Sequence, residues 1–131
     1  MHLHAALITL LTVVVIVIAM MLVGRARGLY QVKAPATTGH PDFERAFRAH
    51  QNTLEQTVIF LPLLWLAAVY GNEQWAAWFG YAWLVGRAWY LYGYVHTADG
   101  RGRGGGFLVS MLAASALLVM GLWAVLPKLF A

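Results

Sequence analysis

Four long apolar segments dominate this chain and restrict it to a helical fold embedded in a membrane. The first spans residues 3–24 and contains the block VVVIVIAMMLV, and the others span about 43–70, 74–96 and 107–126. A bilayer crossing takes about 20 residues of helix, and a chain in lipid must satisfy its backbone hydrogen bonds internally. The sequence therefore predicts an all-α integral membrane protein, a four-helix bundle that forms one domain over residues 1–131.

The composition is typical of a membrane protein and excludes several classes of function. Hydrophobic residues make up 61% of the chain and charged residues 11%, whereas a soluble domain carries about 25% charged residues. The chain has no cysteine, which excludes disulfides, a thiolate nucleophile and a cysteine-ligated metal. It has no HExxH motif or carboxylate-rich cluster, so no metal is expected. The basic residues lie beside apolar runs, a pattern that argues against nucleic-acid binding.

The charges of the links between segments predict an orientation. The second link carries only Glu73, whereas the basic residues in or beside the first and third links are Arg25, Arg27, Lys33, Arg45, Arg48, Arg101 and Arg103. By the positive-inside rule, the first and third links face the cytoplasm and both termini face outward. Lys128 alone opposes this pattern. We expect a protein of the inner membrane whose site opens toward the cytoplasm.

The second segment begins with a polar face that an ordinary spanning helix would not need. Arg48, Asn52 and Glu55 are spaced by four and three residues, which places them on one side of a helix. Glu55 lies some 15 Å or more along the helix from Phe43. A carboxylate at that depth must be paired or face a wet cavity. Arg48, two turns away, could share a ligand with it.

The third segment carries a matching polar face. Arg87, Tyr90 and Tyr94 are spaced by three and four residues, again on one side of a helix. The spacing predicts that Arg87 faces Glu55 or the cavity beside it. Two interpretations remain open on the residues alone: a structural ion pair buried between two helices, or a cavity for a small polar ligand.

The stretch FERAFRAHQNTLEQ resembles the MAPEG family, the membrane-associated proteins of eicosanoid and glutathione metabolism, in a bacterial-type form. The family pattern FER-x-x-RA-x-x-N-x-x-E is matched by Phe43, Glu44, Arg45, Arg48, Ala49, Asn52 and Glu55. A TTG-x-P pattern matches upstream at residues 37–41. The later matches are Arg87, Tyr90, Gly93, Tyr94 and, seven residues on, Arg101.

This resemblance implies a homotrimer with a glutathione site between adjacent subunits. One subunit would hold the tripeptide through Arg48, Asn52, Glu55, Tyr90 and Tyr94, and its neighbour would reach it through Arg27 and His50. Arg101 would lie beside the sulfur and stabilise the thiolate. The implied activity is transfer of glutathione to lipophilic electrophiles, with possible peroxidase activity on lipid hydroperoxides. The alternative within the family is a lipid-binding scaffold without catalysis.

The chemistry of glutathione suits these residues, although three positions depart from the family pattern. Arginine can grip a carboxylate through two parallel hydrogen bonds, and Glu55 suits the ammonium group. Gln56 stands where catalytic members often have tyrosine, and Gly28 where leukotriene-C synthase has a second arginine. Two extra residues follow Arg101 before the fourth segment, which makes Arg103 the alternative partner of the sulfur.

Overall fold

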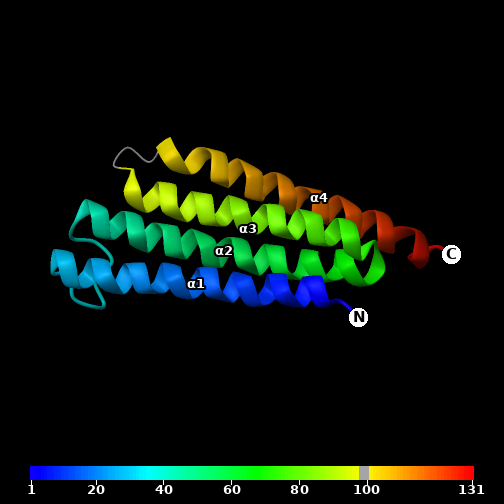
Figure 1. Ribbon diagram of the computed structural model, residues 1–131, viewed down its shortest axis with the longest axis horizontal. Coiled ribbons are helices and arrows are strands. Elements are labelled where there is room, and N and C mark those ends of the chain that lie inside the picture. The colour runs from blue at the N-terminus through cyan, green and yellow to red at the C-terminus, as the bar shows by residue number, and fades with distance from the viewer. Residues whose placement is uncertain (98–100) are drawn as a thin grey trace.

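The chain folds into a long bundle of antiparallel α-helices (Figure 1). The computed structural model describes all residues except 98–100 and the side chain of Arg101. The described helices are α1 (Leu3–Tyr30), α2 (Pro41–Tyr70), α3 (Glu73–His96) and α4 (Gly104–Leu129), with a 3-10 turn, η1 (Arg101–Arg103), before α4. The all-α prediction is confirmed.

Local sequence explains where the helices begin and end. The His40 ring accepts a hydrogen bond from the Asp42 backbone N–H at the start of α2. Pro41 in the first turn of α2 and the Asn72 side chain that caps α3 are both favoured at helix starts. α1 continues past Gly24, the predicted end, and stops at Gln31 in a left-handed conformation. The apolar run ends at Gly24, but the arginines that follow are good helix formers, so the helix outlasts it.

Three of the described helices, α1, α2 and α4, are long and apolar enough to cross a membrane. The windows that qualify have mean hydropathies of 3.1, 1.4 and 2.2. α3 has 24 residues but carries Glu73, Arg87 and His96, which lower its hydropathy. Large apolar side chains such as Val58 and Trp123 are 75% and 82% exposed, as expected of a surface that faces lipid. These features indicate an integral membrane protein, and a fourth crossing by α3 stays a prediction.

Glycine allows α3 and α4 to approach closely near the start of α4. A Cβ atom built on Gly86 would lie 2.7 Å from the backbone nitrogen of Ser110. One built on Gly106 would collide with the backbone of Gly86 and Tyr90. Small residues at such crossings are typical of helix packing in membranes. The contact holds the start of α4 against the part of α3 that carries Tyr90.

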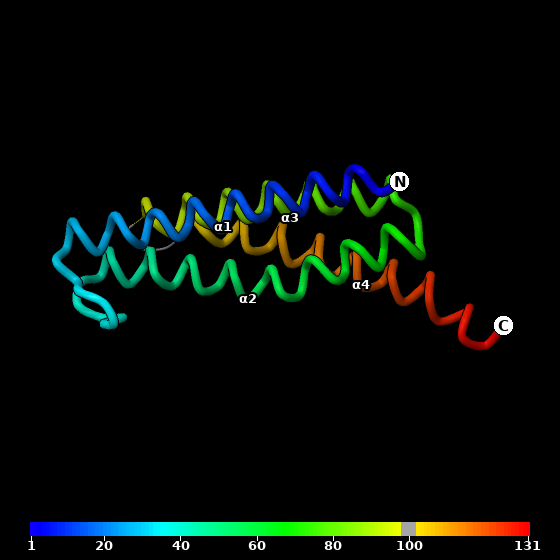
Figure 2. The backbone as a smooth tube through the Cα atoms, turned by 90° about the horizontal axis from the view of Figure 1, so that it is seen from below, coloured from blue at the N-terminus to red at the C-terminus, as the bar shows by residue number. Residues whose placement is uncertain are grey.

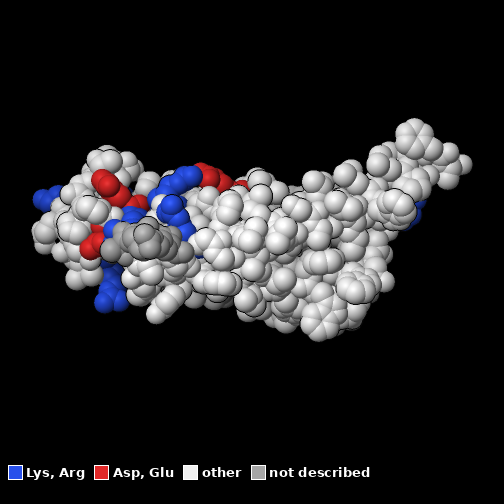
Figure 3. Space-filling model, turned by 90° about the horizontal axis from the view of Figure 1, so that it is seen from above, with Lys and Arg blue, Asp and Glu red and all other residues white. Residues whose placement is uncertain are grey.

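Charged side chains gather at the end of the bundle formed by the first link, η1 and the adjoining helix ends (Figure 3). Both chain termini lie at the opposite end (Figures 1 and 2). We call the end that carries the charged side chains the charged end. The two basic links therefore share one end of the molecule, as the orientation prediction requires, while the compartment that this end faces stays a prediction.

Candidate functional site

A cavity of about 320 Å³ opens at the charged end between α2, α3 and α4. Its lining residues are Arg48, Asn52, Tyr90, Tyr94, Arg103 and Phe107. The first four were singled out from helical spacing, and the fold brings them together from two helices. We call this the polar cavity.

Arg48 and Glu55 contact each other directly at the edge of this site. The Arg48 Nη1 atom donates a hydrogen bond of 3.2 Å to Glu55 Oε1, and the two side chains are 53% and 51% exposed. An ion pair this exposed contributes little to folding stability. Both groups therefore remain accessible to a ligand that offers a new partner to each.

Of the two positions predicted for Arg87, contact with Glu55 is wrong, whereas Arg87 does lie beside the polar cavity, bonded to its lining residue Asn52. Arg87 is fully buried, and its Nη2 atom donates to Asn52 Oδ1 at 2.8 Å and to Thr53 Oγ1 at 3.2 Å. Its guanidinium carbon also lies 4.1 Å from the centre of the Tyr90 ring, a stabilising cation–π contact. Sequence spacing predicted the position of Arg87 along its helix correctly, but it did not show that Glu55 turns toward the exterior. The described partners of Arg87 are therefore neutral groups rather than a carboxylate.

The Arg87 contact fixes how Asn52 presents its amide. A guanidinium has only donors, so the Asn52 oxygen must face Arg87. The Asn52 Nδ2 donors are then left for the polar cavity, which Asn52 lines. Arg87 therefore does not line the polar cavity, but it causes Asn52 to present its Nδ2 donors there.

Aromatic rings and Arg103 form the rest of the cavity lining. The rings of Tyr90 and Tyr94 lie 5.4 Å apart, and the Tyr90 and Phe107 rings 6.2 Å apart. The guanidinium carbon of Arg103 is 4.3 Å from the centre of the Tyr94 ring. Sequence reasoning missed Phe107, because the first residue of an apolar run carries no signal of a polar site. The side chain of Arg101 lies outside the described residues, so its role stays a prediction.

The remaining predicted residues lie away from this cavity. Arg27 donates to the carbonyl oxygens of Ala36 at 2.8 Å and Val32 at 3.3 Å, and so braces the loop after α1. His50 and Gln56 are half-buried on α2 and do not line the polar cavity in the described part of the chain. For Arg27 and His50 the predicted contact comes from a neighbouring subunit, and it stays a prediction.

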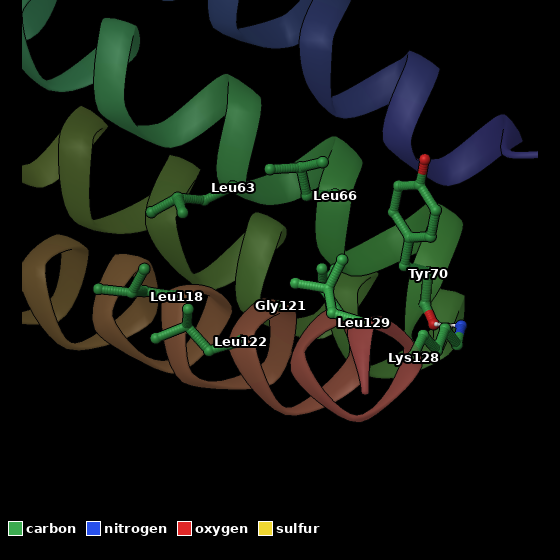
Figure 4. A pocket seen from close by; sticks show the side chains of 9 residues that line it. Leu63, Leu66, Tyr70, Leu118, Gly121, Leu122, Lys128 and Leu129 are labelled. Carbon is green, nitrogen blue, oxygen red and sulfur yellow. Dashed lines mark hydrogen bonds between the residues drawn. The ribbon is translucent and has the colours of Figure 1, made fainter. Parts of the chain in front are cut away.

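A separate apolar cavity of about 470 Å³ lies near the C-terminal ends of α2 and α4 (Figure 4). Leucines line it, and Lys128 Nζ at its edge donates to the Tyr70 carbonyl oxygen at 3.0 Å. The lining residues of the two cavities that are nearest along α2, Asn52 and Leu63, lie about 16 Å apart at 1.5 Å per residue. This cavity is too distant to share a small ligand with the polar cavity. Within the described residues, no group of three or more His, Asp or Glu side chains gathers as a metal site would.

Comparison with known proteins identifies the family of this chain. Residues 5–123 match the MAPEG family. An uncharacterized protein of Synechocystis is 46% identical over 120 residues, which cover 90% of this chain and 88% of the relative. Human microsomal glutathione S-transferase 2 is 43% identical over 96 residues, covering 73% of this chain and 65% of the relative.

A third relative, like the glutathione S-transferase, is named as an enzyme. Leukotriene C4 synthase of Cavia porcellus is 42% identical over 94 residues, which cover 72% of this chain and 63% of the relative. The chain thus spans slightly less than two thirds of the human and guinea-pig proteins. The family match covers nearly all of the helical bundle, including every described residue of the polar cavity. This chain belongs to the MAPEG family.

Proposed function

We propose that this protein is a membrane-bound glutathione S-transferase that joins the glutathione thiolate to lipophilic electrophiles. The observation that carries the proposal is the polar cavity, where Arg48, Asn52, Tyr90 and Tyr94 converge with Arg103 at the charged end of a membrane protein. Relatives named microsomal glutathione S-transferase 2 and leukotriene C4 synthase support the choice of glutathione. The basic links favour a site that opens toward the cytoplasm from the inner membrane.

Binding in this proposal is an exchange of partners. Glutathione carries two carboxylates and one ammonium group, so it can pair with both members of the Arg48–Glu55 contact. Arg48 grips a carboxylate and Glu55 receives the ammonium, while the Asn52 amide donates to a carbonyl or carboxylate oxygen. The exposed ion pair gives up little stability when it opens, so most of the new charge pairing contributes to affinity.

The chemical step requires the thiol to lose its proton. A cation beside the sulfur stabilises the thiolate, and the proton passes to water. The thiolate then attacks the electrophilic atom, forming a carbon–sulfur bond as the leaving group departs with its electron pair. Arg101 is the residue we assign to the sulfur, with Arg103 as the alternative. The same thiolate could reduce a lipid hydroperoxide to an alcohol and water, with a second glutathione completing the disulfide.

The proposal is tested by mixing purified protein with glutathione and recording the ultraviolet absorbance of the thiolate at neutral pH. We expect a saturable thiolate band and conjugation of chlorodinitrobenzene. If neither appears while lipid still binds, the protein is the non-catalytic scaffold known from another branch of this family. The two outcomes separate an enzyme from a lipid-binding protein.

We further propose that the protein is a homotrimer with glutathione bound between subunits. Arg27 and His50 do not line the polar cavity of their own chain in the described structure, yet the family resemblance gives both a role toward glutathione. A neighbouring subunit is the simplest source of those contacts. Mass measurement in mild detergent should give three chains per particle. A monomer that binds glutathione with full affinity would contradict the shared site.

Arg87→Met is expected to weaken glutathione binding about fivefold to tenfold without unfolding the protein. The substitution removes the group that orients the Asn52 amide, at a cost of about 1 kcal/mol for one hydrogen bond. Replacing a buried charge by an apolar side chain of similar length is often tolerated. Calorimetric titration of Arg87→Met, Asn52→Ala and the double variant measures the coupling. Fully additive losses would show that Arg87 does not act through Asn52.

A further inference from the structure

A second cavity with charged walls lies at the charged end, where α1 meets α2 and α3. It has a volume of about 400 Å³. Its polar lining residues are Arg25, Tyr30, Asp42, Arg45 and His96. It shares no described lining residue with the polar cavity. We call it the α1 cavity.

The charges of the α1 cavity favour an anion. Arg45 pairs with Asp42, so these two charges balance each other. Arg25, which is exposed on α1, adds a net positive charge. The Nδ1 atom of the exposed His96 imidazole donates to the Tyr92 carbonyl oxygen at 2.9 Å, which leaves its Nε2 atom for a ligand. A guanidinium matches the geometry of phosphate oxygens, and basic cavities between membrane helices bind the headgroups of anionic lipids.

The remaining walls favour a ligand with long apolar chains. Leu22, Leu29 and Val95 line the same cavity. One turn farther from the charged end, Ile18 and Met21 on α1 are 47% and 66% exposed. An apolar strip therefore runs along α1 from the cavity toward the middle of the bundle. Inorganic phosphate would leave this strip without a partner, whereas a phospholipid would cover it with its acyl chains.

We propose that the α1 cavity binds the phosphate headgroup of an anionic glycerophospholipid, whose acyl chains lie along α1. Arg25 faces the phosphate oxygens, and the His96 Nε2 atom and the Tyr30 ring border the headgroup. The proposal does not depend on glutathione chemistry, because its residues are separate from those of the polar cavity. It commits to a membrane lipid rather than to a soluble anion.

Native mass spectrometry of the purified protein in a non-ionic detergent tests this site. The probes are phosphatidylglycerol, phosphatidylcholine and glycerol phosphate. We expect phosphatidylglycerol to bind at least about tenfold more tightly than phosphatidylcholine. Arg25→Gln should weaken phosphatidylglycerol binding about tenfold, as expected for loss of one hydrogen bond to a charged group. Lys33→Gln, which removes the same charge from the exposed loop between α1 and α2, should leave it unchanged.

Three outcomes would overturn the proposal. Equal losses of phosphatidylglycerol affinity in Arg25→Gln and Lys33→Gln would mean that the lipid is attracted to the charged end as a whole rather than to this cavity. Equal binding of the two phospholipids would remove the anionic specificity, and equal binding of glycerol phosphate would make this a site for a soluble anion. Thermal unfolding and glutathione affinity of each variant check that the fold is intact. If Arg25→Gln does not fold, His96→Gln on α3 provides the same comparison against Lys33→Gln.

Discussion

Replacing Arg48 with alanine is expected to weaken glutathione binding by roughly 2–5 kcal/mol while the protein stays folded. The loss is large because a carboxylate of the bound ligand is left without its partner in a partly dry cavity. The effect on folding is small because the only described ion pair of Arg48, with Glu55 at 3.2 Å, is half exposed. Glu55→Ala should produce a loss of similar size, since it removes the partner of the ligand ammonium.

Isothermal titration calorimetry with glutathione measures these losses, and thermal unfolding shows whether the bundle is intact. Matched controls are Lys128→Ala and Glu73→Ala, which remove the same charges at the opposite end of the bundle. Neither control should change the affinity for glutathione. If Arg48→Ala and Glu55→Ala bind as tightly as the parent and remain folded, the pair is a surface contact and the ligand lies elsewhere.

Arg101→Ala is expected to bind glutathione almost normally and to conjugate chlorodinitrobenzene far more slowly. A free thiol with a pKa near 8.5 is only a few per cent ionised at neutral pH. Lowering that pKa by about two units takes about 2.7 kcal/mol of preferential stabilisation of the thiolate. Without the cation, the glutathione pKa returns toward its free value, so the rising limb of the pH–rate profile moves to higher pH. The thiolate absorbance at neutral pH should disappear.

Arg103→Ala is the matched control, two residues along the same turn. Arg103 lines the polar cavity and lies over the Tyr94 ring, so its loss should raise KM moderately and leave kcat near the parent value. Exchange of the two behaviours would assign the sulfur to Arg103 instead. If both variants keep the thiolate band, the Tyr94 hydroxyl becomes the group to test.

Helical spacing predicted several residues of the site, because spacing depends only on the period of the α-helix. Arg48 and Asn52 on one helix, and Tyr90 and Tyr94 on another, line one cavity as their spacing suggested. Spacing gives depth and side but not the rotation of one helix against another. For that reason spacing alone left open whether Arg87 faces Glu55 or the cavity beside it, and the fold turns it toward Asn52 and Thr53.

Other features of the site depend on contacts that no local pattern records. Arg103 enters the cavity because η1 folds back over α3, and Phe107 enters because glycines let the start of α4 come close. The end of α1 at Tyr30 was missed because hydropathy marks the lipid-embedded part of a helix rather than its whole length. Contacts between subunits are likewise invisible in the pattern of a single chain.

The size of the polar cavity depends on the glycine contact between α3 and α4, which fixes the distance between the two helix backbones. Gly86 and Gly106 lie against backbone atoms of the facing helix, so even a methyl group at either would force the two helices apart. Tyr90 on α3 and Phe107 on α4, whose rings lie 6.2 Å apart, are next to that crossing and would move with it. Trimming an aromatic side chain would therefore enlarge the cavity only by the volume removed, because the distance between the two backbones stays the same. A wider separation of α3 and α4 at the site would require the packing of the bundle to change with it.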